Sequence, residues 1–227
     1  MNAKKEQVQS MFDAIAHRYD LLNRVLSGGT DVYWRRKALK LTRFQPGAIL
    51  LDIACGTGDV SIEARKMGVT SIFGADVSYN MLTLFQKKSD WITGKSVQMV
   101  AEHIPLKGAS VTNITVAFGV RNFYDLPLAF ASFHRILKPG GKATILEFRM
   151  PSNPLVKAGY RFYFKRILPF LGKFVSKHPD AYQYLPDSVE EFDRKVNLPQ
   201  LLQEAGFKHV EAHPLTFGIA QVVIATK

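Results

Sequence analysis

Short apolar runs alternate with helix-length amphipathic segments through the middle of the chain. The apolar runs predict five strands, at residues 49–53, 71–75, 96–100, 113–117 and 142–148. The remaining segments predict helices at residues 60–67, 79–88 and 127–137, and a turn at residues 138–141. Helix-length connections join parallel strands through right-handed crossovers. The alternation therefore predicts an α/β fold with a mostly parallel sheet and helices on both faces.

The two ends of the chain follow other patterns. Apolar residues at helical spacing predict two helices before the first strand, at residues 8–19 and 32–41. We expect them to form a helical cap over the C-terminal edge of the sheet. Near the other end, a helix at residues 198–205 precedes two strands, at residues 208–215 and 219–226. This antiparallel hairpin would make the sheet mixed and bring it to seven strands.

Residues 153–178 combine basic and aromatic side chains and contain no acid. Lys157, Arg161 and Lys165 are spaced four apart and share one helical face, and Pro169 should break or kink the helix. This composition suits an interfacial helix or a lid over an apolar substrate. It would also suit a stacking platform for single-stranded bases, or a core helix with a solvated basic face. The pattern leaves these alternatives open.

The apolar run at residues 49–53 leads into a glycine-containing turn that suggests a ligand site. The run carries Asp52 near its end and is followed by Gly56 and Gly58, and then by a segment able to form a helix. The amides that begin such a helix have no internal partners, so the turn suits a polar ligand. Asp76 ends the next apolar run, about 20 residues on, where a βαβ unit places a carboxylate on a ribose. We therefore favour a nucleotide-type cofactor over a purely structural turn.

The length of 227 residues suits a single α/β domain. We divide it into a helical cap at 1–45, a cofactor-binding core at 46–150, an aromatic and basic lid or membrane-facing insertion at 151–195, and a C-terminal helix and hairpin at 196–227. The formal net charge is +11. A charge of this size favours an anionic partner, either nucleic acid, an acidic lipid surface or an anionic small molecule.

Other features bear on location and on metal chemistry. No stretch approaches the ~20 apolar residues of a membrane span, and the N-terminus lacks the apolar core of a signal peptide. The single cysteine, Cys55, excludes an internal disulfide, and we interpret it as a small residue in a tight turn. We expect a cytoplasmic protein. No His or Cys cluster has metal-ligand spacing, so no metal site is predicted.

The glycine turn, the second acid and the closing hairpin together resemble the class I S-adenosylmethionine-dependent methyltransferase fold. Further stretches make the chain similar to the ubiquinone/menaquinone biosynthesis C-methyltransferases of the UbiE/MenG type. These stretches are residues 12–23, Trp34-Arg35, Phe118-Gly119-Val120-Arg121-Asn122-Phe123, residues 135–141, Leu146-Glu147-Phe148 and residues 182–188. The Lys-Pro-Gly-Gly turn identifies only the fold, whereas Phe-Gly-Val-Arg-Asn-Phe is far more restrictive.

The resemblance implies methyl transfer from S-adenosylmethionine to a ring carbon of a polyprenylated hydroquinone. We expect demethylmenaquinol as the acceptor, with the ubiquinone-pathway benzoquinol as the alternative. Because such a product dissolves in the membrane, peripheral contact with an anionic surface at its inner face is expected. An RNA acceptor or a binding protein without turnover are further alternatives. We expect no nucleic acid partner, and a homodimer stays open.

The resemblance also assigns cofactor residues. It implies that the loop around the methionine and ribose portions is formed by Asp52, Gly56, Thr57 and Gly58, and that Asp76 accepts hydrogen bonds from the ribose hydroxyls. It also implies adenine contacts by Val77, Met81, Val100 and Ala101, and a contact after the fourth strand by Ala117. Two features depart from the family. Val100 and Ala117 stand where a polar residue is common, and the last strand lacks the usual histidine.

Fewer residues can be assigned to the binding of the methyl acceptor. A ring carbon becomes nucleophilic when its neighbouring hydroxyl loses a proton, so the site should stabilise a phenolate. Arg121 is our candidate catalytic residue for that role, with a packing ion pair as the alternative. Tyr19 and Arg35 are expected either to close over the methionine end or to serve structural roles in the cap. His103 is more often a surface residue, and Glu147 is expected to anchor a loop.

Overall fold

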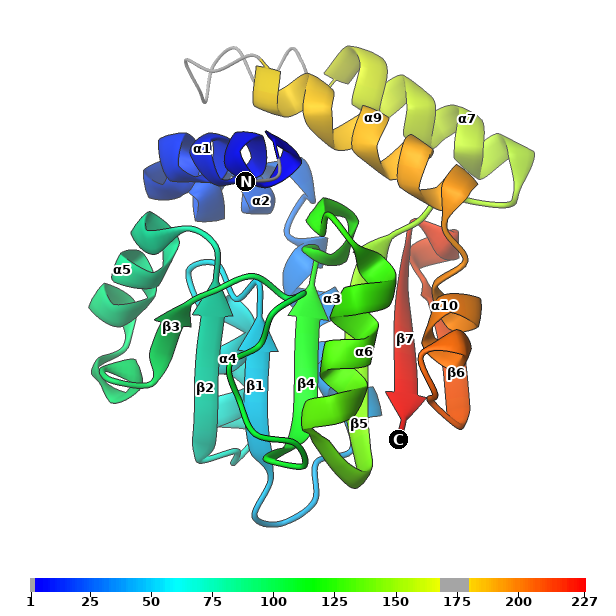
Figure 1. The fold of residues 1–227 in the computed structure, drawn as a ribbon. Coiled ribbons are helices and arrows are strands. Elements are labelled where there is room, and N and C mark those ends of the chain that lie inside the picture. Colours follow the sequence, from blue (N-terminus) through cyan, green and yellow to red (C-terminus); the bar gives the residue numbers. More distant parts are fainter. Residues whose placement is uncertain (1–2, 168–179) are drawn as a thin grey trace.

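A computed structural model describes residues 3–167 and 180–227. Its sheet has seven strands in the order β3-β2-β1-β4-β5-β7-β6 (Figure 1). The strands are β1 (Ile49–Ile53), β2 (Ser71–Asp76), β3 (Ser96–Gln98), β4 (Val111–Ala117), β5 (Leu137–Phe148), β6 (His209–Leu215) and β7 (Ala220–Thr226). Strands β1 to β5 pair in parallel, and β7 runs antiparallel to both β5 and β6. The predicted mixed sheet with its terminal hairpin is confirmed.

Helices cover both faces of the sheet, as the crossover pattern predicts. Helices α3 (Thr30–Thr42) and α4 (Asp59–Lys66) pack on one face, and α6 (Leu126–Ile136) and α10 (Leu198–Glu204) on the other, while α5 (Tyr79–Lys88) covers β2 and β3 (Figure 1). Short 3-10 turns lie at Ala16–Arg18, Asp90–Ile92, Val120–Asn122 and Thr216–Gly218. Side-chain caps begin several helices, because Ser78 and Asp125 accept the amides of Met81 and Leu128.

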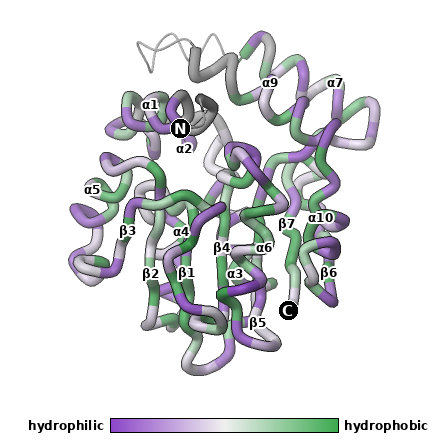
Figure 2. The backbone as a smooth tube through the Cα atoms, in the orientation of Figure 1, coloured by the Kyte–Doolittle hydropathy of each residue, from purple (hydrophilic) through white to green (hydrophobic). Residues whose placement is uncertain are grey.

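The central strands form the core, and they are the apolar part of the chain in Figure 2. Leu51 and Ile114, which are paired on neighbouring strands, are buried and share one core cluster with Phe130 and Phe133 of α6. Burying such a side chain stabilises the fold by roughly 1.5–3 kcal/mol relative to leaving it exposed. A parallel sheet packed on both faces explains why these strands read as continuous apolar runs.

Two helical pairs lie above the carboxyl ends of the parallel strands (Figure 1). One pair is α1 (Ala3–Ile15) and α2 (Tyr19–Leu26), the other α7 (Pro154–Phe162) and α9 (Asp180–Lys195). A π-helical turn at Tyr163–Ile167 follows α7. Of the two helices expected to cap this edge, the first lies over it as α1 and α2, whereas the second, α3, packs on a face of the sheet because its buried side chains meet β5 and β7. The predicted kink at Pro169, and the rest of residues 168–178, lie outside the described residues.

Several predicted boundaries were wrong. The expected turn at Lys138–Gly141 is part of β5, because Leu137 pairs with Val111 and extends the strand backwards across a register shift. Gly140 has a φ of +73° at this irregularity. Strand β3 ends at Gln98 rather than residue 100. The single helix expected at residues 8–19 is divided into α1 and α2 by the 3-10 turn Ala16–Arg18.

Candidate active site

The glycine turn after β1 and the acidic end of β2 form a joined polar site. Asp76 Oδ2 accepts the Gly56 amide at 2.8 Å, and its Oδ1 accepts the Ser78 amide at 2.9 Å. Asp76 is buried, and desolvation raises its carboxyl pKa to about 6 despite these backbone hydrogen bonds, which lower it. The carboxylate thus fixes the turn and retains further acceptor lone pairs for a ligand.

A pocket opens between this turn and the neighbouring strand ends. Six of the predicted cofactor residues line it: Gly56, Asp76, Val77, Val100, Ala101 and Ala117. Met81, expected near an adenine, lines it as well. The walls are largely apolar, with the Asp76 carboxylate as a charged group. This combination of an acceptor for hydroxyls and an apolar slot matches the chemistry of a nucleoside.

The other three predicted cofactor residues lie behind the pocket or at its rim. Asp52 is fully buried, and its carboxylate accepts the hydroxyls of Ser61 at 2.7 Å and Thr115 at 2.8 Å. Desolvation raises its pKa to about 6. Gly58 has a φ of +86°, and a Cβ there would lie 2.1 Å from the Phe85 ring. These residues shape the loop, and their side-chain positions do not line the pocket.

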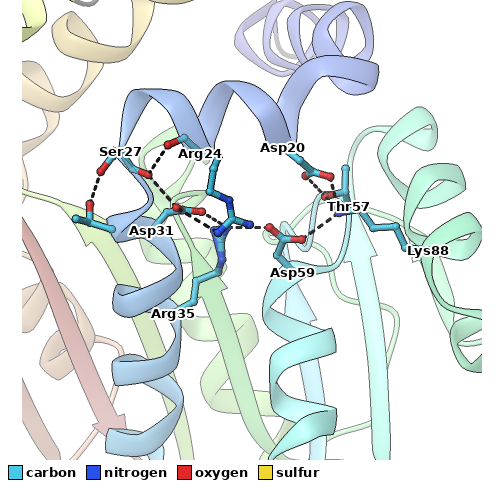
Figure 3. Close-up of polar contacts among 9 residues, drawn as sticks. Asp20, Arg24, Ser27, Asp31, Arg35, Thr57, Asp59 and Lys88 are labelled. Atoms are coloured by element: carbon cyan, nitrogen blue, oxygen red, sulfur yellow. Dashed lines mark hydrogen bonds and ion pairs between the residues drawn. The ribbon is translucent and has the colours of Figure 1, made fainter.

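The third of these residues, Thr57, belongs to a polar network that joins the cap to the core (Figure 3). Its hydroxyl donates to Asp20 of α2 and accepts from Lys88 of α5 at 2.9 Å. Lys88 also bonds Asp59, the first residue of α4, at 3.0 Å. Arg35 of α3 bonds the same Asp59 at 2.8 Å. Burial would raise the pKa of Asp59, but Arg35 and Lys88 outweigh it and hold the pKa below its ordinary value.

Arg35 is engaged within this network rather than offered to a cofactor carboxylate. Its Nη2 is shared between Asp31 of its own helix and Asp59 of α4. Arg24 of α2 approaches Asp31 at 3.8 Å, and the Ser27 hydroxyl donates to Asp31 at 2.8 Å. Of the two roles expected for Arg35, the geometry matches the structural one in the cap.

The carboxyl ends of β1 and β4 lie at the point of the sheet where a crevice is expected. Strand order reverses here, because β2 lies on one side of β1 and β4 on the other. Ala54 and Phe118 directly follow these strands and have φ values of +52° and +59°. A Cβ at Gly119 would lie 2.5 Å from the Ala54 Cβ, so the close approach requires glycine. Such strained backbone is typical of functional sites.

A second, larger cavity of about 550 Å³ adjoins the pocket, and we call it the acceptor cavity. Its walls come from α3, β5, the Val120–Asn122 turn, α7 and α9. They include Trp34, Arg121, Phe148, Tyr160, Phe164 and Leu185. Phe12, Tyr19 and Phe118 line both spaces. These three side chains mark the junction at which a group bound in one space would meet a group bound in the other.

Arg121 lies in the wall of the acceptor cavity and is held by a buried ion pair. Its Nη1 bonds Glu147 at 2.8 Å and the Phe118 carbonyl at 2.6 Å. Glu147 is fully buried and also accepts the amides of Arg121 and Phe148. Glu147 is therefore the anchor expected from the sequence. Both roles considered for Arg121 fit this geometry. An ion pair holds the side chain, and its Nε has no partner in the part of the chain that the structure describes.

Two further candidate residues, His103 and Cys55, are not in positions that suit a catalytic role. His103 is exposed in a loop. Cys55 is buried, and desolvation raises its thiol pKa well above the ordinary value, which disfavours a reactive thiolate. Within residues 3–167 and 180–227, no group of three or more His, Cys, Asp or Glu side chains could hold a metal ion. No helix in the described part of the chain is long and apolar enough to cross a membrane.

Comparison with known proteins decides the family. The chain matches the ubiE/COQ5 methyltransferase family over residues 1–227. It belongs to this family. A Geotalea daltonii protein named ubiquinone/menaquinone biosynthesis C-methyltransferase UbiE is 44% identical, over 100% of this chain and 99% of its own. A Chlorobaculum parvum protein named demethylmenaquinone methyltransferase is 40% identical, over 98% of this chain and 93% of its own.

Solved structures agree on the fold of this ubiE/COQ5 family member. A SAM-dependent methyltransferase of Thermotoga maritima superposes with a TM-score of 0.63 at 18% identity, over 96% of this chain and 99% of that one. One from Aquifex aeolicus superposes with a TM-score of 0.59 at 17% identity, over 87% and 91%. The predicted class I methyltransferase fold is confirmed. The protein is an S-adenosylmethionine-dependent C-methyltransferase, as the resemblance implied.

Sequence reasoning missed several residues of both spaces. Phe12 and Tyr124 line the cofactor pocket, and Asn23 and Tyr160 line the acceptor cavity. Tyr160 lies in the aromatic and basic segment that the sequence singled out, but no local pattern distinguished it from its aromatic neighbours. Phe12 is part of a stretch that carried the family resemblance. Its place in the pocket depends on how α1 folds over the sheet.

Proposed function

We propose that the protein methylates a ring carbon of a polyprenylated hydroquinone, most directly demethylmenaquinol to menaquinol. The observation that supports this most is the acceptor cavity, which is large, mainly apolar and joined to the cofactor pocket at Phe12, Tyr19 and Phe118. An aromatic ring with an isoprenoid tail needs such walls. Relatives named demethylmenaquinone methyltransferase support the naphthoquinol, and those named for both pathways keep the benzoquinol as the alternative.

The pocket suits S-adenosylmethionine on the chemistry of its own residues. Asp76 would accept hydrogen bonds from the ribose hydroxyls, and Val77, Met81 and Ala101 would contact the adenine. Backbone groups take the place of side-chain hydrogen bonds at Val100, which is apolar. When bound, the cofactor supplies an electrophilic methyl group on a sulfonium.

The chain's own residues would prepare the acceptor ring. The hydroquinol hydroxyl beside the reacting carbon would lose its proton to solvent, and the electron pair left on oxygen would raise electron density at that carbon. The Arg121 guanidinium stays protonated and can donate from Nε to this oxygen. Glu147 holds the guanidinium in place. As the methyl group bonds to carbon, its bond to sulfur would break with the electron pair staying on sulfur. The ring proton would then pass to solvent, which restores the aromatic ring, and the phenolate oxygen would regain a proton.

Label transfer tests the proposal. The protein would be incubated with S-adenosylmethionine carrying a labelled methyl group, separately with reduced demethylmenaquinol, a prenylated benzoquinol and bulk RNA. We expect label in the naphthoquinol. Label in both quinols would establish a dual role, and label only in RNA would overturn the proposal. Cofactor binding with no transfer to any acceptor would favour a binding protein without turnover.

We further propose that α7 contacts an anionic membrane surface, from which the acceptor enters. Leu155 and Phe162 lie two helical turns apart on one face of α7 and are 84% and 62% exposed. Arg161 and Arg166 are also exposed. Exposed apolar residues flanked by basic ones favour an interfacial helix, at about 1 kcal/mol per basic residue near an anionic surface.

Vesicle sedimentation tests this contact. The protein should bind vesicles containing phosphatidylglycerol more strongly than vesicles of phosphatidylcholine alone. The double variant Leu155→Ser, Phe162→Ser should lose most of this binding and still methylate a short-chain quinol dispersed in detergent. Tyr79→Ser, which alters a side chain 66% exposed on α5, serves as the matched control. Equal binding of both variants would contradict the proposal.

A further inference from the structure

Two polar atoms in the wall of the acceptor cavity lack a partner. Among the described residues, three buried side-chain atoms make no hydrogen bond, namely Ser110 Oγ, Arg121 Nε and the Tyr160 hydroxyl. Ser110 precedes β4 at the opposite end of the sheet. Arg121 and Tyr160 both line the acceptor cavity, although they lie on different elements. A buried donor without a partner is costly, so two in one cavity indicate a ligand that completes them.

Both side chains are held firmly in place. The Tyr160 ring is 6% exposed, packs with Met150 and Val189, and lies 4.2 Å from the Phe164 ring between centroids. The Arg121 side chain is 7% exposed and is fixed through its Nη1. Both side chains are therefore held in fixed positions, and the two donor atoms are shielded from solvent by their neighbours.

Both groups can donate a hydrogen bond. A guanidinium has no acceptor atom. Burial raises the pKa of the Tyr160 hydroxyl far above its ordinary value, and the nearby Arg121 charge only partly offsets this. The Tyr160 hydroxyl thus keeps its proton. The ligand that fits must offer oxygen acceptors in an otherwise apolar ring.

We propose that Tyr160 binds the second ring oxygen of the acceptor, across the ring from the oxygen that Arg121 holds. This inference rests on the proposed function, because it assumes a hydroquinol in the cavity. The two donors come from different elements, α7 and the Val120–Asn122 turn, so each can serve a different oxygen of one ring. Tyr160 therefore selects 1,4-dioxygenated rings over rings with one hydroxyl, and links recognition to α7.

The test is a cycle of binding measurements made without the cofactor. Dissociation constants would be measured by calorimetry under anaerobic conditions, for wild type and Tyr160→Phe. The ligands would be a short-chain prenylated naphthohydroquinol and its analogue without the remote hydroxyl. Losing either the Tyr160 hydroxyl or the remote hydroxyl should weaken binding about tenfold. Removing both hydroxyls, by pairing Tyr160→Phe with the analogue, should also weaken binding by only about tenfold, because the two groups bind each other.

Controls separate this role from a structural one. Tyr160→Phe removes a hydroxyl that bonds nothing in the protein, so its melting temperature should not fall. Tyr33→Phe, at a side chain 54% exposed on α3, should bind both ligands as wild type does. Additive losses, or equal affinity of Tyr160→Phe and wild type, would overturn the inference. If wild type binds and methylates no quinol at all, the proposed function itself fails.

Discussion

The cofactor pocket and the acceptor cavity share Phe12, Tyr19 and Phe118 but are built in different ways. In the pocket, both oxygens of Asp76 already accept backbone amides, and the walls are the ends of adjacent strands. In the cavity, Arg121 Nε and the Tyr160 hydroxyl have no hydrogen-bond partner within residues 3–167 and 180–227. Its walls are segments far apart in the chain. The first space is therefore preorganised by local backbone, whereas we propose that a ligand completes the second.

The largest effect is expected at Arg121, on the acceptor side alone. The pair Arg121→Gln, Glu147→Gln removes both buried charges together and should leave cofactor binding within a few-fold of wild type. Methyl transfer should fall about 100-fold or more, which is the usual cost of losing one donor to a developing oxyanion. Calorimetry for the cofactor and label transfer to quinol measure the two effects separately.

The single variant Arg121→Ala serves as a contrast. It leaves the fully buried Glu147 carboxylate without its charged partner, so we expect a loss of stability of about 3–5 kcal/mol. Removing Arg36 from its exposed pair with Glu63 should cost about 1 kcal/mol or less. Unfolding in urea compares the two. Full activity of the double glutamine variant would remove Arg121 from the mechanism.

The next effect is expected on the cofactor side. Asp76→Asn should weaken S-adenosylmethionine binding roughly 10–100-fold, because hydrogen bonds to a charged group are lost. In wild type, cofactor binding should weaken as the pH falls below about 6, where the Asp76 carboxyl takes up a proton. Asp52→Asn is the matched control, since Asp52 is buried at the same edge without lining the pocket. Equal losses of cofactor affinity in both variants would contradict a direct role of Asp76 in cofactor binding.

A smaller effect concerns stability and pH. The pKa of Asp52 is raised from 3.8 in its ordinary state to about 6 in the fold. Its contribution to stability is therefore fully present below the unfolded pKa and is lost as the pH rises through about 6. The stability of Asp52→Asn relative to wild type should increase from pH 4 to pH 7, by at most about 3 kcal/mol. Urea unfolding at several pH values measures the slope. A flat difference would contradict the raised pKa.

The smallest effect is expected in the network between cap and core. Lys88→Gln removes contacts to Asp20, Thr57 and Asp59, but Arg35 still holds Asp59. Partly exposed pairs contribute about 1 kcal/mol or less, so cofactor release should speed up a few-fold. Added salt should also speed up cofactor release from wild type, because it screens the same ion pairs. Stopped-flow fluorescence of the cap residue Trp34 reports release. Lys195→Gln, in an exposed pair on α9, should change nothing.

The sequence predicted the glycine turn and the acid beside it, because both follow from neighbours in the chain. A strand, a glycine turn and a helix recur within a few residues, and the acid ending the next strand lies beside the turn through parallel pairing. Hence Gly56 and Asp76 were expected together and are hydrogen-bonded. The cofactor roles expected for Asp52 and Thr57 stay predictions. In the protein, Asp52 accepts the hydroxyls of Ser61 and Thr115, and Thr57 bonds Asp20 and Lys88, and local spacing carries no signal for these partners.

The sequence by itself determined the order of strands and helices, the mixed sheet and the glycine turn, because periodicity and turn chemistry are short-range. Only the tertiary structure decided the acceptor cavity. It brings Trp34, Arg121 and Tyr160 together from three distant segments, and it leaves two donors unpaired. Which aromatic residue of a basic helix turns inward depends on packing against α9 and β5. Such packing is a long-range property that no spacing within the helix encodes.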